Sequence, residues 1–283
     1  MTHIPLGGST GSSSRGTSSS VTVAGTSRSA TSYGSGGGKA TTIPSGQIFA
    51  GRTEGGGTRD QVFGSSTYGS GYPGITGRGV AGRGFPFLFW PVVWGGAAGA
   101  GSGAYLHDTE YGSPDNTSRP GGPMMTSTFV SSASTSLNST LSPTTFHVLA
   151  DNTTLISLIS AITMNCSTNI NTSSSTSNAS DPNPYNASDS NVPQPESAIE
   201  YYRASSVVLT LDGYNNSAVL SSDENATNTP LPGGIDTTLQ DCLNQTIGAA
   251  VPLIDGATRV STGPRIEAMA LLSLVIVFLQ LLV

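Results

Sequence analysis

The chain has 283 residues, of which 10% are charged, and a formal net charge of −6. After position 84 it carries fifteen acidic residues against four basic ones. This balance excludes nucleic acid as a partner, because phosphate neutralisation needs clustered lysine and arginine.

Residues 1–84 are rich in glycine, serine and threonine, with 20 serines and threonines among the first 46 residues. Such a stretch has too little apolar surface to offset the entropy of ordering it, so we expect it to be disordered. It would carry O-linked glycans or serve as a flexible tail. Gly77, Gly79 and Gly82 have the spacing of a dinucleotide-binding loop, but no strand is expected before them and no helix after them. No cofactor is therefore predicted.

Residues 85–106 carry no charge and begin with the aromatic run FPFLFWPVVW. These 22 residues could cross a bilayer as a signal anchor, and Arg78 and Arg83 before them would keep the N-terminus in the cytosol. The prolines and glycines weaken a helix, which leaves two alternatives: the apolar part of a signal peptide, or an aromatic loop packed outside any membrane. The N-terminal residues MTHIPLGGSTGSSS contain no apolar run that could direct secretion instead.

Residues 107–142 form a linker rich in serine, threonine and proline, and N-glycosylation sequons begin there. Asparagine is absent before position 116, whereas fifteen asparagines follow up to position 244 and ten of them begin an N-x-S/T sequon. That is about twice the number expected by chance, which indicates a glycosylated, luminal segment. The predicted glycosylation sites are Asn116, Asn138, Asn152, Asn165, Asn171, Asn178, Asn186, Asn215, Asn225 and Asn244.

Residues 143–254 show the clearest periodicity, and here we predict an ectodomain of the α+β class, a small disulfide-bridged domain of two helices on a short antiparallel sheet. Residues 144–149 and 200–211 are predicted strands. One helix should begin after Asp151 or Asn152 and end near Cys166, and a second should begin after Asp236. The two cysteines of the chain, Cys166 and Cys242, lie on or beside apolar helix faces, so we expect a disulfide rather than a metal site.

Residues 255–283 have the layout of a signal for glycosylphosphatidylinositol (GPI) attachment: a small triplet at 255–257, a polar spacer of ten residues, and an uncharged apolar tail of sixteen. As a helix the tail would be about 24 Å long, short of the roughly 30 Å hydrocarbon core of a bilayer. We therefore expect the tail to be cleaved and the lipid to be attached at Asp255 or its neighbour Gly256.

Catalytic constellations are not evident. The three histidines are isolated in the sequence, and the acidic pairs Asp108 with Glu110 and Asp223 with Glu224 fall in predicted loops rather than in a rigid cleft. We expect no enzymatic activity and no metal site; a secreted hydrolase is the alternative, without a candidate nucleophile or base.

Four phrases, GVAGRGFPFLFWPVVWGG, TTFHVLADNTT, YYRASSVVLTLDGYNNS and DCLNQTIGAAVPLIDGA, resemble a group of fungal proteins predicted to be secreted or surface-anchored. The resemblance covers roughly residues 39–257 and implies location, without an activity.

The sequence thus predicts a non-enzymatic glycoprotein, carried by the secretory pathway to the extracellular face of the plasma membrane. Its partners would be the membrane, through a lipid anchor or a helix, and a cell-wall glycan; no small-molecule substrate is predicted. The alternative is an integral membrane protein that retains one or two spans, at 85–106 and 268–283, flanking a luminal ectodomain.

Overall fold

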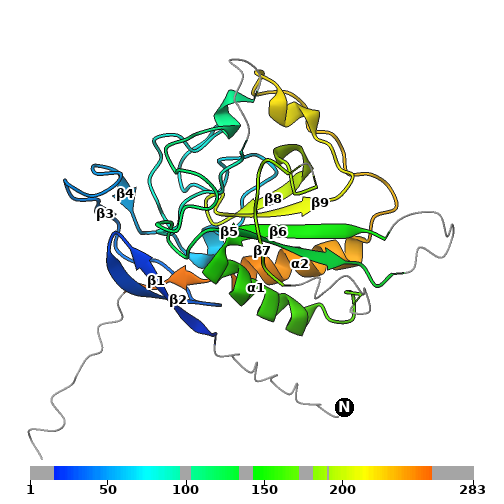
Figure 1. The fold of residues 1–283 in the computed structure, drawn as a ribbon, viewed down its shortest axis with the longest axis horizontal. Helices are drawn as coiled ribbons and strands as arrows, with labels where there is room; N and C mark the ends of the chain where they lie inside the picture. The colour runs from blue at the N-terminus through cyan, green and yellow to red at the C-terminus, as the bar shows by residue number, and fades with distance from the viewer. Residues whose placement is uncertain (1–15, 96–102, 134–142, 172–180, 190, 257–283) are drawn as a thin grey trace, which may run out of the picture.

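The computed structural model describes residues 16–95, 103–133, 143–171, 181–189 and 191–256. Its largest element is a five-stranded antiparallel sheet in the order β7-β5-β6-β9-β8, which crosses the middle of the molecule (Figure 1). In its central register Phe146 lies opposite Phe129 and Leu211, and all three side chains are buried. The strands are β5 (Met124–Val130), β6 (Thr145–Asp151), β7 (Asn183–Pro184), β8 (Ala198–Tyr202) and β9 (Val207–Leu211).

Two helices, α1 (Asn152–Asn165) and α2 (Thr237–Ala250), cover one face of this sheet (Figure 1). Each begins after an aspartate whose carboxylate accepts hydrogen bonds from the free amides of the first turn, Asp151 for α1 and Asp236 for α2. The buried apolar faces consist of Leu155, Leu158 and Ile162 in α1 and of Leu239, Leu243 and Ile247 in α2.

The other face of the sheet packs against loops that include the aromatic segment. Tyr201 and Tyr202 are neighbours on β8 and point to opposite faces of the sheet, as successive side chains of a strand do. Each of them therefore contacts one of the two layers that cover the sheet. The Tyr201 hydroxyl accepts a hydrogen bond from Trp94 Nε1 at 3.1 Å, whereas the Tyr202 hydroxyl donates to Asn244 Oδ1 of α2 at 2.7 Å. Phe85 and Trp94 are 3% and 2% exposed. The described part of residues 85–106 thus has the arrangement of a packed aromatic loop.

A smaller sheet brings together the two ends of the described chain. β1 (Ser18–Val23) and β2 (Thr26–Thr31) form a hairpin, and β10 (Leu253–Ile254) pairs with β2 (Figure 1). Ala24 and Gly25 connect β1 to β2 with φ angles of 47° and 75°, the left-handed conformation that a two-residue hairpin turn requires. The remaining elements are the ribbon of β3 (Thr41–Thr42) and β4 (Thr53–Glu54) and the 3₁₀ turns Arg59–Gln61, Ala104–Leu106, Pro195–Ser197 and Ser217–Leu220.

The predicted fold class is therefore wrong. Regular structure is mostly sheet, in three antiparallel sheets of which one has five strands, and not a small pair of helices on a short sheet. The glycine-, serine- and threonine-rich region is not disordered from residue 16 onwards, because Val21, Ala30, Val62 and Tyr68 join the same core as the later residues. The few apolar side chains of this region are enough to order it, because they pack against apolar surfaces that distant parts of the chain supply. Residues 1–15 lie outside the described ranges.

The turn between β8 and β9 places a buried arginine at the centre of the molecule. Residues 203–205 have three consecutive positive φ angles of 50°, 49° and 58°, which residues other than glycine rarely adopt. Arg203 is 0% exposed, and it donates hydrogen bonds to Asp151 Oδ2 and to the Pro252 carbonyl, both at 2.9 Å. Its guanidinium lies 3.5 Å from the ring centroid of Phe89. The guanidinium of Arg203 thus connects this turn to the start of α1 through an ion pair, and to the segment before β10 through a hydrogen bond.

Glu200 on β8 is a carboxylate whose charged form the fold disfavours. Burial raises its pKa to about 7 from the ordinary 4.5. The folded protein therefore binds this proton more tightly than the unfolded chain does, so the contribution of Glu200 to stability is greatest below about pH 4.5 and is lost as the pH rises through 7. Asp108, whose pKa burial also raises, acts in the same direction.

We expect the Glu200→Gln protein to lose less stability than the wild type between pH 4.5 and 8. The difference should be roughly 1–2 kcal/mol, because Glu200 keeps part of its hydration and the full effect of the pKa shift is not felt. Urea unfolding at several pH values measures it, with Glu224→Gln in an exposed loop as the matched control. Identical pH dependence in all three proteins would rule out this role for Glu200.

Candidate functional site

Cys166 and Cys242 are joined by a disulfide, with their Cα atoms 5.9 Å apart. Cys166 follows the last residue of α1, and Cys242 lies in the middle of α2. The two helices already pack side by side on the sheet, so the bridge closes a loop of 76 residues without requiring them to move.

The predicted glycosylation sites lie at the surface wherever the structure describes them. Of the ten sequon asparagines, Asn138 and Asn178 lie outside the described ranges, and none of the other eight is buried. By contrast Asn216, which does not begin a sequon, is 0% exposed. Asn244 is half-buried, since its amide oxygen accepts the hydrogen bond from Tyr202.

Asp255, the predicted site of lipid attachment, directly follows β10. Its carboxylate accepts a hydrogen bond from the Gly36 amide at 2.7 Å, and its backbone forms a bridge with Gly37. The described part of the domain therefore extends to the expected cleavage point. The spacer and the apolar tail lie in residues 257–283, outside the described ranges.

The acidic pair Asp108 and Glu110 is engaged in structural contacts. Asp108 Oδ1 accepts the amide of Glu110 at 2.9 Å, and Glu110 binds the Arg52 guanidinium and the Gly82 amide. Burial alone would raise the pKa of Glu110, but the hydrogen bonds from Arg52 and Gly82 outweigh it and lower the pKa to about 2. Both oxygens of Glu110 are thus used to hold loops together. The second pair, Asp223 and Glu224, is exposed.

His147 lies on β6 and contacts two side chains. Its Nε2 lies 2.8 Å from Asp212 Oδ1, and its Nδ1 lies 3.1 Å from the hydroxyl oxygen of Thr128. Within the described ranges no group of three or more His, Cys, Asp or Glu could hold a metal ion. In the same part of the chain, no helix is both long enough and apolar enough to cross a membrane.

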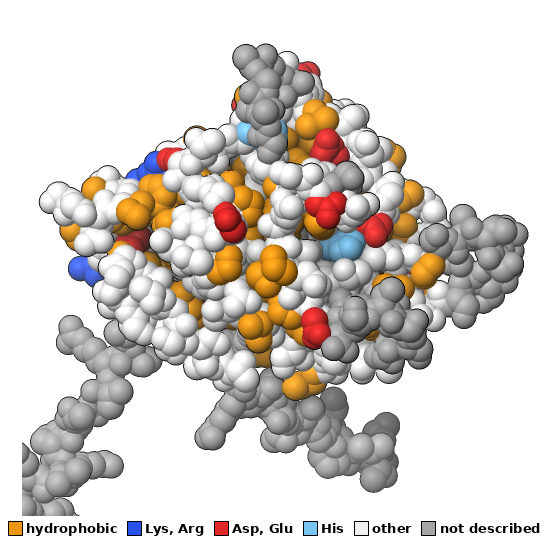
Figure 2. Space-filling model, in the orientation of Figure 1, with side chains coloured by type: hydrophobic (Ala, Val, Ile, Leu, Met, Phe, Trp, Pro, Cys, Tyr) orange, Lys and Arg blue, Asp and Glu red, His pale blue; other side chains and the backbone are white. Residues whose placement is uncertain are grey.

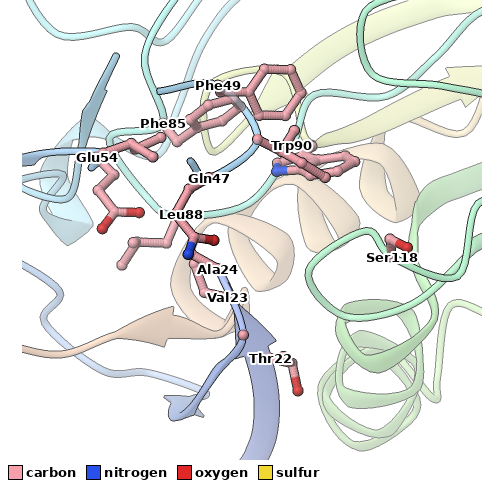
Figure 3. A pocket seen from close by; sticks show the side chains of 13 residues that line it. Thr22, Val23, Ala24, Gln47, Phe49, Glu54, Phe85, Leu88, Trp90 and Ser118 are labelled. Carbon is pink, nitrogen blue, oxygen red and sulfur yellow. The ribbon is translucent and has the colours of Figure 1, made fainter. Parts of the chain in front are cut away.

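A pocket of about 300 Å³ opens between the β1–β2 turn and the loop that joins β3 to β4. Phe49, Phe85 and Trp90 line one side of it (Figure 3). Phe49 is the centre of this group, with its ring centroid 5.0 Å from those of both other residues and its plane nearly perpendicular to that of Trp90. The cluster gives the pocket a rigid apolar wall.

Polar side chains complete the lining. Glu54 and Ser118 lie at opposite ends of the pocket, with Gln47 between them (Figure 3). Glu54 is 8% exposed; its nearest ionic neighbour is Arg28, with 3.9 Å between nitrogen and oxygen, and no described residue donates a hydrogen bond to its carboxylate. Apart from the ion pair with Arg28, the carboxylate therefore keeps free acceptor positions for a ligand.

Three of the seven described residues other than glycine that have positive φ angles line this pocket. Ala24, Phe49 and Leu88 all line the pocket, and their φ angles are 47°, 64° and 70°. A left-handed conformation costs a residue other than glycine of the order of 1 kcal/mol or more, and such residues cluster at binding sites because the surrounding fold must hold them.

Sequence reasoning missed this pocket. Its residues come from the region predicted to be disordered, from the aromatic segment and from the linker, and they form no motif. The phrase IPSGQIFAGRTE carries a signal in retrospect, because Ile43 and Phe49 flank a Pro-Ser-Gly turn between two short threonine-containing strands.

Comparison of the chain with known protein families, with curated proteins and with solved structures gave no match.

Proposed function

We propose that the chain is a non-enzymatic, N-glycosylated protein of the extracellular face of the plasma membrane. The secretory pathway would deliver it, and a lipid at Asp255 or Gly256 would hold it there. The observation that carries the proposal is the placement of the sequons: none of the eight described sequon asparagines is buried, and four of them, Asn165, Asn186, Asn215 and Asn225, are exposed. A chain that acquires glycans before it folds tolerates them only at such accessible positions.

The disulfide supports the same compartment. Disulfides persist in secreted and surface proteins and are rare where thiols are kept reduced. Here both cysteines of the chain are used in one bridge between two helices.

The position of Asp255 supports the mode of attachment. The folded domain reaches to this residue, and the small residues and the polar spacer follow at once in the sequence. A GPI signal has this order of parts, with the tail removed on attachment. The mature protein would then sit close to the membrane, without a long stalk at its C-terminal side.

Mass spectrometry of the mature protein should show N-glycans on most of the ten sequons and none on Asn216. N-glycosidase in heavy-oxygen water converts each glycosylated asparagine to a labelled aspartate, which identifies the sites. The last peptide should end at Asp255 or Gly256 and carry the ethanolamine phosphate of a lipid anchor.

Two results would contradict this proposal. Unmodified sequons throughout would mean that the domain never entered the secretory pathway. Peptides that extend to Val283, on a glycosylated protein, would show that the tail is retained, which is the transmembrane alternative.

A further inference from the structure

The pocket beside the β1–β2 turn combines apolar walls with polar groups that have no partner. Within the described ranges no hydrogen bond engages the side chains of Thr22, Gln47, Trp90 or Ser118, and Glu54 has no hydrogen-bond donor. The Trp90 indole is a hydrogen-bond donor, and the Glu54 carboxylate is an acceptor. The Gln47 amide and the hydroxyls of Thr22 and Ser118 can each donate and accept. A ligand that fits must therefore offer donors and acceptors around an apolar body.

Charge around the pocket favours a neutral ligand. Glu54 and Arg28 lie 3.9 Å apart and together carry no net charge, so the site does not select an anion. A cation would meet rings that already face cations, because the Arg52 guanidinium lies 4.7 Å from the centroid of Phe49 and that of Arg119 lies 5.7 Å from Trp90. The face of the molecule in Figure 2 carries few charges, and its lysines and arginines lie beside the β3–β4 ribbon.

The size of the site suits a small cyclic molecule or a short chain of such units. About 300 Å³ is at the lower end of ligand pockets. A second cavity of about 210 Å³ shares Glu54 and Leu88 with the first and continues past Lys39 to Gly256. Glu54 therefore lies between two adjoining hollows, where it could contact two consecutive units of a ligand.

We propose that this pocket binds a neutral saccharide, with the sugar ring against Phe49 and Trp90 and its hydroxyls bonded to Glu54, Gln47 and Ser118. A pyranose has the required properties, since its C–H faces are apolar while each hydroxyl both donates and accepts. Carboxylate acceptors strengthen such bonds, because charge-assisted hydrogen bonds are stronger than neutral ones. The surrounding fold holds Ala24, Phe49 and Leu88 in their left-handed conformations, so this part of the lining is formed before a ligand arrives.

Tryptophan fluorescence reports on this site directly, because the protein has two tryptophans with different surroundings. Trp94 is 2% exposed, whereas Trp90 is partly exposed in the pocket. The full chain produced in eukaryotic cells would be treated with N-glycosidase, so that its own glycans do not compete. The probes are mannose, glucose, galactose and N-acetylglucosamine, each as the free sugar and as a linear tetrasaccharide.

We expect at least one tetrasaccharide to protect Trp90 from acrylamide quenching in a saturable way. Trp90→Phe should abolish the change, and Glu54→Gln should weaken binding about tenfold or more. Gln47→Ala, at an exposed position whose side chain makes no hydrogen bond to a described residue, should weaken it a few-fold without affecting the fold. The matched control is Glu224→Gln, in an exposed loop, which should bind as the wild type does.

Two outcomes would overturn the proposal. Saturable protection by tetramethylammonium but by no sugar would make the pocket a cation site. Absence of binding by every sugar at millimolar concentration, or binding that Glu54→Gln and Gln47→Ala both leave unchanged, would show that no saccharide uses this pocket. Neither outcome depends on localisation, so the surface-glycoprotein proposal stands or falls separately.

Discussion

Replacing Asp151 with alanine should lower the free energy of unfolding by about 3–5 kcal/mol, because the change leaves the guanidinium of Arg203 buried without its carboxylate. Arg203 is 0% exposed and Asp151 is 6% exposed, so water cannot take over the lost contact. The same substitution removes the N-cap of α1, which adds about 1 kcal/mol. Urea unfolding at pH 7 measures the sum.

The chain supplies a matched control for this experiment. Asp236 caps α2 in the same way, with its carboxylate accepting the amides of Thr238 and Leu239 and the hydroxyl of Ser131, but it takes part in no ion pair within the described ranges. Asp236→Ala should therefore cost about 1–3 kcal/mol, less than Asp151→Ala. In the double mutant Asp151→Ala/Arg203→Met, part of the loss should be recovered, because no charge remains buried. Equal losses for the two single substitutions would show that the ion pair contributes nothing.

Removal of the disulfide should be the other large effect. The Cys166→Ser/Cys242→Ser protein should lose about 4 kcal/mol of stability, within the 2–5 kcal/mol usual for native disulfides, because opening a loop of 76 residues restores entropy to the unfolded chain. Both cysteines are replaced so that no free thiol confuses the result. The measurement is the urea midpoint of wild type and variant.

Reductant provides the control for this prediction. Wild-type protein unfolded in the presence of a reducing agent should behave as the double variant does, and the variant should not respond to reductant. Alkylation of the folded wild type without reductant should modify neither cysteine. A midpoint that is the same with and without reductant would show that the bridge does not constrain the unfolded state.

Local signals predicted the helices well. Each has an aspartate before its first turn and apolar residues at helical spacing, and both caps are formed by the predicted side chains, Asp151 and Asp236. The strand predicted at residues 144–149 is present as β6. The segment 200–211, predicted as one strand, is two strands joined by a turn, because Arg203 leaves the sheet to reach Asp151. Nothing in the sequence near Arg203 indicates that distant partner.

The rest of the fold could not be predicted from the sequence, because it depends on pairing between segments that lie far apart in the chain. β1 has apolar residues at two alternate positions, Val21 and Val23, too few to distinguish a strand from a flexible serine-rich tail. Its sheet is completed by β10, more than 200 residues later. The run at residues 85–94 is apolar throughout, and a membrane segment and a buried loop look alike in composition.

The pocket was unpredictable for a related reason. Its lining joins the β1–β2 turn, the β3–β4 loop and the segment around Trp90, and each contributes three or four residues that form no recognisable motif alone. Glu54 lies in the region that the sequence predicts to be disordered. Its burial depends on Phe85, which pairs with it in a parallel bridge.

The pairing of β2 with β10 limits the order in which the strands of this protein can pair. Ala30 can pair with Ile254 only once residue 254 has been synthesised, so β2 keeps one open edge until then. A chain that stops before Leu253 would keep that edge and should tend to aggregate. We therefore expect the pairing of β2 with β10 to be a late step of folding.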